Sequence, residues 1–193
     1  VRKDLAKKGR RTIFNLLGPL INPARPNFQL LGVFSPLLVK PLAETLHALG
    51  LERGLVVHGK TGPGSGIDEL TCSGENIVAG FGELVELRKD SWLPGTFGLT
   101  TCPEKDLKGG NLEDNLRIME DILAGRAPDG LLATIAANAG AALFIAKKTI
   151  DVREGTALAK ERFPFSRNLL EFWRQRFLNG SCNRFTRLVA VYD

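Results

Sequence analysis

Cysteine, histidine and tyrosine are scarce in this 193-residue chain, which has three cysteines, two histidines and one tyrosine. The cysteines, Cys72, Cys102 and Cys182, are far apart in the sequence, and none of them belongs to a CxxC motif. An odd number of widely spaced cysteines excludes a disulfide scaffold and a zinc knuckle as the basis of the fold. Free thiols favour a reducing compartment, so we expect a cytoplasmic protein.

Long hydrophobic runs are also missing. The run over residues 131–146 is interrupted by Asn138 and is shorter than the ~18–20 residues that a membrane-spanning helix requires. We therefore expect no membrane segment. The chain starts with Val1 instead of Met, and Val1–Arg11 is too basic for a secretory signal. We expect it to be the C-terminal part of a longer protein whose N-terminal segment is absent.

Charge is unevenly distributed along the chain. Hydrophobic residues make up 44% and charged residues 24%, which is typical of folded proteins, and the net charge is +5. Residues 1–12 have six Lys or Arg against one Asp, and residues 143–193 have ten against five acidic residues, so the middle is acidic. Basic ends are compatible with phosphate or nucleic-acid binding. The interpretation that we favour is a solvated surface together with pairing to the absent segment, because basic patches of this size are common.

Apolar runs of strand and helix type alternate in the first third of the chain. Gln29–Phe34 is a compact apolar run that predicts a buried strand. Ser35 and Pro36 are typical of a helix start, and Leu37–Leu49 has apolar residues at helical spacing. Gly54–His58 predicts a second buried strand. Together these segments predict a right-handed, parallel βαβ unit.

The rest of the chain completes an α/β pattern. We expect 11–28 to be an ordered loop with a short helical turn, and 59–66, with four glycines, to be a flexible turn. A hairpin is predicted for 75–81 and 83–88 around Gly82, followed by a loop over 90–101 with Trp92 and Phe97 as anchors. Helices are predicted for 112–123, 130–147 and 152–162. The predicted class is α/β, with a mixed, mostly parallel sheet flanked by helices.

Several motifs resemble those of one enzyme family. Arg11–Leu20 (RTIFNLLGPL), followed by Asn22-Pro23, resembles a signature of the anthranilate phosphoribosyltransferases. The resemblance covers about residues 1–162 in the family's order. Its further motifs are QLLGVFSP at 29–36, VVHG at 56–59, GIDE at 66–69, KGG at 108–110, EDN at 113–115 and AANAGAAL at 136–143.

The resemblance implies a fold and an activity. The fold is the larger domain of a two-domain protein similar to phosphoribosyltransferases and nucleoside phosphorylases. The activity is transfer of the phosphoribosyl group from phosphoribosyl pyrophosphate (PRPP) to anthranilate, which gives phosphoribosylanthranilate and pyrophosphate in tryptophan biosynthesis. The cofactor would be Mg²⁺, and the full-length protein would be a homodimer.

Asp68 and Glu69 are the candidate metal ligands. From the residues alone, they follow a predicted parallel strand and a glycine-rich turn, at the edge where open α/β sheets bind ligands. Two adjacent carboxylates offer the hard oxygen ligands that suit Mg²⁺. Adjacent acidic residues are also common on solvated surfaces. The resemblance decides between these interpretations, because GIDEL matches the family's magnesium-binding acidic pair.

Arg2 is the candidate substrate-binding residue. The resemblance places it on a family arginine that contacts the carboxylate of anthranilate, and a planar guanidinium suits that contact. The stretch Ala6–Arg10 makes the connection to Phe14 longer than in the family, so Lys3 and Arg11 are alternatives.

Two family motifs have no counterpart in this chain: the glycine-rich GTGGD loop, which binds pyrophosphate, and the Lys-His-Gly-Asn stretch. We therefore assign no catalytic residue and expect the 193-residue chain alone to be inactive. The division we predict is a C-terminal part of the phosphoribosyltransferase domain over 1–162 and an aromatic, basic and helical segment over 163–193.

An alternative function is a non-catalytic, nucleic-acid-binding paralogue of the same fold. Basic and aromatic residues within 163–177 would supply phosphate contacts and base stacking. The acidic pair and the intact RTIFNLLGPL motif argue against this, because DNA phosphates do not require carboxylates. Two further residues receive structural interpretations: His58 as a buried structural histidine, and Cys72 as a small buried hydrophobic residue.

Overall fold

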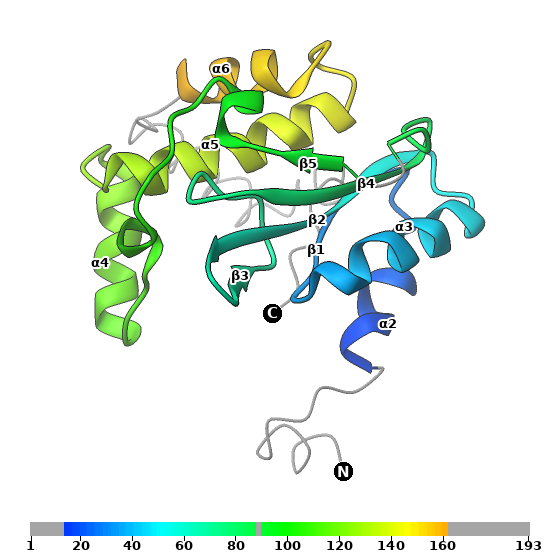
Figure 1. Cartoon of the computed structure of the whole chain (residues 1–193), viewed down its shortest axis with the longest axis horizontal. Coiled ribbons are helices and arrows are strands. Elements are labelled where there is room, and N and C mark those ends of the chain that lie inside the picture. The colour runs from blue at the N-terminus through cyan, green and yellow to red at the C-terminus, as the bar shows by residue number, and fades with distance from the viewer. Residues whose placement is uncertain (1–13, 88–89, 162–193) are drawn as a thin grey trace, which may run out of the picture.

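The computed structural model describes residues 14–87 and 90–161 (Figure 1). Several predictions fall outside these residues: the role of Arg2, the basic stretch 1–12, the part of the basic C-terminal stretch beyond residue 161, the segment 163–193 and Cys182. Within the described residues, no helix is long and apolar enough to cross a membrane.

A mixed sheet with helices on both faces forms the centre of the molecule. Its strands are β1 (Phe28–Gly32), β2 (Arg53–Gly62), β3 (Ser65–Ile67), β4 (Asn76–Gly82) and β5 (Asp90–Trp92). The strand order is β1-β2-β4-β5, and β3 also pairs with β2. β1 and β2 are parallel, whereas β2–β3, β2–β4 and β4–β5 are antiparallel.

The predicted βαβ unit is confirmed. The Ser35 side chain accepts a hydrogen bond from the Leu37 N–H at 3.4 Å and caps η1 (Pro36–Leu38). This turn leads directly into α3 (Val39–Ala48), which ends before Gly50, where φ is +79°. A left-handed residue at this position reverses the chain into β2, and glycine adopts it without steric cost.

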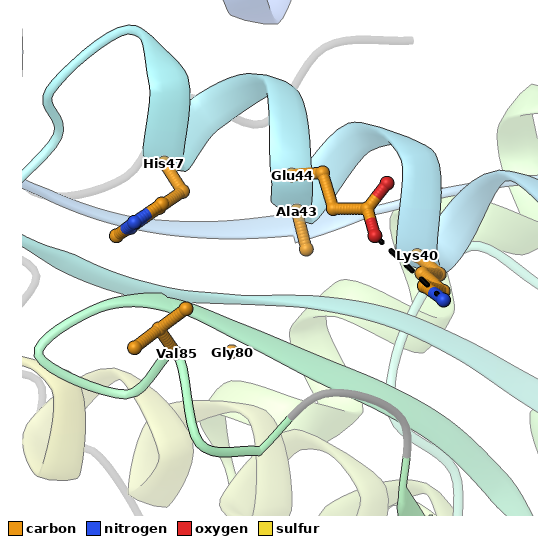
Figure 2. A pocket seen from close by; sticks show the side chains of 6 residues that line it. All are labelled: Lys40, Ala43, Glu44, His47, Gly80 and Val85. Atoms are coloured by element: carbon orange, nitrogen blue, oxygen red, sulfur yellow. Dashed lines mark ion pairs between the residues drawn. The ribbon is translucent and has the colours of Figure 1, made fainter.

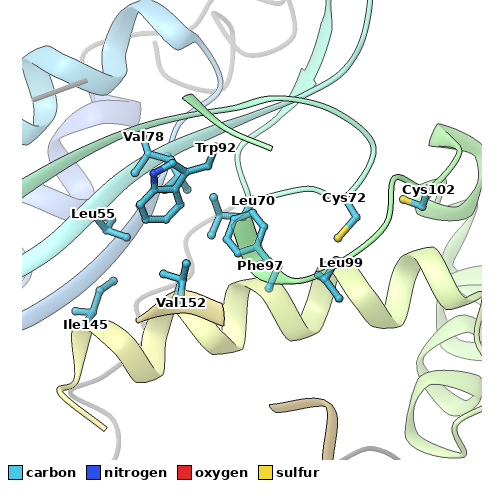
Figure 3. Packing of buried hydrophobic residues seen from close by; sticks show 13 residues of the cluster. Leu55, Leu70, Cys72, Val78, Trp92, Phe97, Leu99, Cys102, Ile145 and Val152 are labelled. Atoms are coloured by element: carbon cyan, nitrogen blue, oxygen red, sulfur yellow. The ribbon is translucent and has the colours of Figure 1, made fainter. Parts of the chain in front are cut away.

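Alternating side chains on the central strands build two separate cores. Val56 on β2 and Ile77 on β4 face α3, and pack with its buried residues Val39, Leu42, Ala43 and Leu46. Leu55, Val57 and Val78 face the other side, against α5 (Asp129–Ile145) (Figure 3). Strand residues point alternately to opposite faces, so a sheet covered on both sides is apolar at every position.

The second face of the sheet is covered by α5, with α6 (Val152–Glu161) packed against it. Trp92 and Phe97 are buried beneath them, as predicted, with ring centroids 5.9 Å apart in an edge-to-face arrangement. The two helices approach closely because both have glycine at the crossing. A Cβ on Gly140 would collide with the backbone of Thr156, and one on Gly155 with the backbone of Gly140.

The remaining helices lie at the margins. α2 (Phe14–Leu20) is the predicted helical turn, and α4 (Leu112–Leu123) extends away from the sheet with no buried residue (Figure 1). α4 begins at a capping box, in which Asn111 and Asp114 each accept a hydrogen bond from the other's backbone N–H. The two short 3₁₀ turns η2 (Pro94–Phe97) and η3 (Glu104–Leu107) connect β5 to α4.

The prediction of a flexible turn over 59–66 is wrong. β2 continues to Gly62, and the chain then turns at Pro63 and Gly64 and returns as β3. Gly64 has φ +73°, which suits the tight turn. In the sequence these glycines suggest flexibility, but Gly66 is needed because β3 crosses His58 at contact distance: a Cβ would lie 2.5 Å from its Nε2 atom.

Two further predictions are wrong in detail. The strand expected over 83–88 is a compact turn at residues 83–86, and β4 pairs instead with β5, where a loop is predicted. The class α/β with a mixed sheet is confirmed, but the expected majority of parallel strands is not found among the described residues, where only β1–β2 is parallel. The central β2 is flanked by β4 in antiparallel orientation, which the order of elements does not reveal.

Candidate metal-binding site

The position of the acidic pair follows from two strands that meet end to end. One edge of β2 pairs with β1 along Arg53–Val57 and with β3 from Gly59 onward, while β4 occupies the other edge. β1 is parallel to β2 and β3 is antiparallel, so the two strands run toward each other. They meet at Gly32 and Asp68, and the chain must leave the sheet there.

Glycines allow the ends of β1 and β3 to approach each other closely. The missing side chain of Gly32 leaves room for the backbone carbonyl of Asp68, which occupies the place of a Cβ. On β2, a Cβ on Gly59 would lie 2.5 Å from the carbonyl oxygen of Glu69. Both carbonyls of the acidic pair therefore pack directly against the sheet. The bend is fixed by backbone contact, which needs glycine on the strand side.

Helix α5 holds the chain immediately after the bend. The Asn138 side chain accepts a hydrogen bond from the Leu70 N–H at 3.1 Å and donates one to the Leu70 carbonyl at 2.8 Å. Two residues further on, the Cys72 N–H donates to the Thr134 hydroxyl at 3.2 Å. Leu70 itself is fully buried in the core beneath α5 (Figure 3).

A second amide side chain holds the same segment from the sheet. Asn76, at the start of β4, accepts from the Thr71 N–H at 2.7 Å and donates to the Thr71 carbonyl at 3.0 Å. Asn76 and Thr71 are both fully buried. Residues 70–72 belong to no strand, yet their backbone groups are satisfied, by side chains at every group except the Cys72 carbonyl, which accepts from the Cys102 N–H at 2.9 Å.

Asp68 and Glu69 are both exposed residues, although the neighbouring chain partly shields the Glu69 carboxyl from solvent. Partial burial of its carboxyl raises the pKa of Glu69, and the neighbouring negative charge of Asp68 raises it further. A bound cation would relieve both effects. Within residues 14–87 and 90–161, no group of three or more His, Cys, Asp or Glu side chains is placed to hold a metal ion.

This donor set fits Mg²⁺. Mg²⁺ is bound by one or two protein carboxylates together with waters and substrate phosphates, and rarely by a complete protein cage. Two exposed carboxylates on a rigid bend leave the other coordination positions open. The pair follows the parallel strand β2 in the sequence, as expected, but an unpredicted short strand, β3, which is antiparallel to β2, comes directly before it. The pair nevertheless lies at the carboxyl end of the parallel strand β1, where α/β sheets bind ligands.

His58 and Cys72 are buried and have structural roles, as predicted, and Cys102 is buried as well. His58 is 5% exposed, and its Nδ1 atom lies 2.8 Å from the Val33 carbonyl oxygen, so this nitrogen donates the hydrogen bond. Burial raises the pKa values of the Cys72 and Cys102 thiols. A raised thiol pKa lowers the thiolate fraction, so neither cysteine is an activated nucleophile.

Two cavities among the described residues lie away from the acidic pair. A cavity of about 210 Å³ between α3 and β4 is lined by Lys40, Ala43, Glu44, His47, Gly80 and Val85 (Figure 2). Its polar groups are partly engaged, because Lys40 pairs with Glu44 at 3.7 Å and the His47 Nδ1 atom accepts from the Gly82 N–H at 3.2 Å. A cavity of about 680 Å³ lies near α2 at the amino ends of β1 and β2, opposite the acidic pair.

Sequence reasoning missed the residues that hold the bend, namely Asn76, Thr134 and Asn138. A signal existed for Asn138, because it interrupts an otherwise apolar run. A single amide in an apolar helix indicates a buried hydrogen-bond partner.

Comparisons with known proteins match most of this chain. A family model described as the a/b domain of a glycosyl transferase family matches residues 1–164. An anthranilate phosphoribosyltransferase of Shewanella sp. (strain MR-4) is 46% identical over 151 residues, which are 77% of this chain and 41% of that protein. The chain thus spans less than half the length of this relative.

Solved structures agree. Anthranilate phosphoribosyltransferase from Thermus thermophilus is 43% identical with a TM-score of 0.70, over 82% of this chain and 45% of that one. The enzyme from Saccharomyces cerevisiae in complex with PRPP and Mg is 25% identical with a TM-score of 0.66, over 83% of this chain and 43% of that one. The fold and the family match agree, and this chain belongs to the glycosyl transferase family through its a/b domain.

Proposed function

We propose that the full-length protein containing this chain transfers the phosphoribosyl group from PRPP to anthranilate, in tryptophan biosynthesis. The observation that carries the proposal is the rigid bend at the end of β1, which presents two adjacent carboxylates to solvent. The relatives support the choice of substrates, because the similar proteins and solved structures described above are named anthranilate phosphoribosyltransferases.

In this proposal Asp68 and Glu69 bind Mg²⁺, as the PRPP and Mg complex of the yeast relative supports. When bound, the ion neutralises negative charge on the departing pyrophosphate. The contribution of the chain is to hold two hard oxygen ligands at a fixed spacing. The close backbone packing against Gly32 and Gly59 supplies this rigidity, so little ordering is required when the ion binds.

Arg2 is proposed to bind the carboxylate of anthranilate, on the family resemblance alone, since it lies outside the described residues. Arg2→Ala in the full-length protein should raise the KM for anthranilate about 10–100-fold, because a charge-assisted contact contributes roughly 1.5–3 kcal/mol. The KM for PRPP should stay nearly unchanged, and Arg2→Lys should restore the anthranilate KM only in part. An unchanged anthranilate KM would assign the contact to Arg11 or Lys3 instead.

The central test removes the charge of the acidic pair. Asp68→Asn combined with Glu69→Gln in the full-length protein should keep the fold and lose most Mg²⁺-dependent formation of phosphoribosylanthranilate, since amides are poor Mg²⁺ ligands. The matched control, Glu86→Gln with Glu120→Gln, removes the same charge from exposed positions away from the bend. Turnover of the acidic-pair variant within about twofold of wild type at saturating Mg²⁺ would refute the proposal.

We also propose a cytoplasmic homodimer for the full-length protein. The buried free thiols of Cys72 and Cys102 support a reducing compartment. The dimer rests on the family resemblance, and the molar mass of the full-length protein in solution tests it.

A further inference from the structure

We propose that Asn138 is a positioning residue for the metal site, which fixes the spacing and direction of the Asp68 and Glu69 carboxylates from helix α5. This inference rests on the proposed metal role of the acidic pair. It assigns a function to a side chain that lies on another element, 69 residues beyond Glu69 in the sequence.

Asn138 contacts the backbone of Leu70 at two points. One amide side chain forms hydrogen bonds with both backbone groups of Leu70, at 3.1 Å to the N–H and 2.8 Å to the carbonyl. A pair of bonds to the two groups of one residue fixes both the position and the rotation of its backbone. Leu70 follows Glu69 directly, so its orientation sets the direction in which the bend leaves the sheet.

The Asn138 side chain is itself held rigidly. Its Nδ2 atom also donates to the Thr134 carbonyl one helical turn earlier, at 2.9 Å. The Thr134 hydroxyl in turn accepts from the Cys72 N–H. The side chains of Asn138 and Thr134 therefore bind the backbone of residues 70–72 at successive points. Neighbouring small residues of α5, such as Ala137 and Ala141, are buried in the core and anchor the helix.

The two sides of the bend are held by different contacts. Before the bend, β3 is a three-residue strand, which gives limited hold on its own. At the bend, Gly32 and Gly59 prevent movement toward the sheet but contribute no attractive side-chain contact. The bonds from Asn138 lie on the other side and oppose movement away from the sheet. Both constraints are needed to keep the carboxylates at one spacing.

Loss of the amide should therefore weaken metal binding without removing a ligand. Residues that orient metal ligands typically contribute about 10–100-fold to metal affinity. In the full-length protein, we expect Asn138→Ala to lower the affinity for Mn²⁺, a spectroscopic probe for Mg²⁺, by at least about tenfold in electron paramagnetic resonance titrations. The Mg²⁺ concentration for half-maximal activity should rise, while the KM for anthranilate stays near the wild-type value.

Two further variants make the test specific. Asn138→Gln keeps the amide but moves it by one methylene, so it should also weaken Mn²⁺ binding, and it decides the test if Asn138→Ala does not fold. Thr156→Val removes a different buried polar contact on α6, from the Thr156 hydroxyl to the Val152 carbonyl, and should destabilise the protein while leaving Mn²⁺ affinity unchanged. Hydrogen exchange at the Leu70 amide should accelerate in the Asn138 variants only.

The outcomes separate this inference from the proposed function. Wild-type Mn²⁺ affinity in both Asn138 variants, with strong loss in the Asp68→Asn, Glu69→Gln protein, would overturn the inference and leave the metal site intact. Unchanged Mn²⁺ affinity in the acidic-pair variant would overturn the proposed metal role, and the inference with it. Equal loss of affinity in Thr156→Val would show a general effect of destabilisation and would also overturn the inference.

Discussion

At Gly32, the place that a Cβ would take is occupied by the backbone carbonyl of Asp68. Gly32→Ala must therefore displace the bend, because the added Cβ and the Asp68 carbonyl are both fixed to the backbone and cannot rotate away from each other. We expect destabilisation by about 1–3 kcal/mol, the usual cost of overpacking, and at least about tenfold weaker Mn²⁺ binding. Thermal unfolding and a metal titration measure the two effects.

Gly95→Ala is the matched control for this substitution, because an added Cβ at Gly95 meets no atom within 4 Å. It should leave both unfolding and metal affinity close to wild type. A Gly32→Ala protein with wild-type metal affinity would show that the bend tolerates displacement, against the rigidity argued above.

The raised pKa of Glu69 predicts how its charge affects stability. A carboxyl that is harder to ionise in the folded than in the unfolded state destabilises the fold when it is charged. This holds at every pH above the pKa of the carboxyl in the unfolded state, which is about 4.3. Without metal at pH 7, Glu69→Gln should thus raise Tm by about 1–2 °C, since exposed charges contribute less than about 1 kcal/mol. Well below pH 4, the two proteins should unfold at the same temperature. A lower Tm for Glu69→Gln at pH 7 would contradict this prediction.

Among the elements, the crossing of α5 and α6 depends on backbone contact. Gly140→Ala would gain about 0.5–1 kcal/mol of helix propensity, but overpacking costs about 1–3 kcal/mol. The clash is with the backbone of Thr156, which side-chain rotation cannot relieve, so overpacking should dominate. We expect a net loss of about 1–2 kcal/mol in the free energy of unfolding, measured with urea.

Gly18→Ala is the control in a helix with open space, because an added Cβ there meets no atom within 4 Å. It should be neutral or slightly stabilising. Equal stability of Gly140→Ala and wild type would mean that the two helices can move apart at little cost.

Local signals predicted the helices and the βαβ unit well, since caps, proline positions and apolar spacing act within a few residues. Ser35-Pro36 and the apolar residues of 112–123 are examples. The sheet was harder to predict, because strand partners are set by contacts between distant residues. The glycines of 59–66 show the difficulty: the sequence shows that side chains are missing, but not that His58 fills the space above Gly66.

The site was predicted in part for the same reason. The acidic pair itself was assigned from the family resemblance, and its structure is compatible with that role. The residues that hold it, Asn76, Thr134 and Asn138, act across up to 68 residues of sequence separation. Their role can be recognised only in the structure, which shows the backbone groups that their side chains bind.

For the whole molecule, the main prediction is that the 193-residue chain does not catalyse the transfer by itself. It contains the proposed metal ligands but no GTGGD motif for the pyrophosphate, and positioning and charge stabilisation both depend on that loop in the family pattern. Purified chain incubated with PRPP, anthranilate and Mg²⁺ should form no phosphoribosylanthranilate. Measurable Mg²⁺-dependent product would show that the PRPP site is complete within these residues.

The hairpin between β2 and β3 offers a practical consequence. Its tip at Pro63 and Gly64 is exposed, and nothing lies within 4 Å of an added Cβ on Gly64. The acidic pair is held from β1, β2 and α5, so the tip can be altered without moving it. A cysteine placed at Pro63 would accept a fluorescent or paramagnetic label a few residues from the pair. Such a label would test directly whether the proposed metal and phosphorylated substrate bind near the pair, in a protein whose bend remains intact.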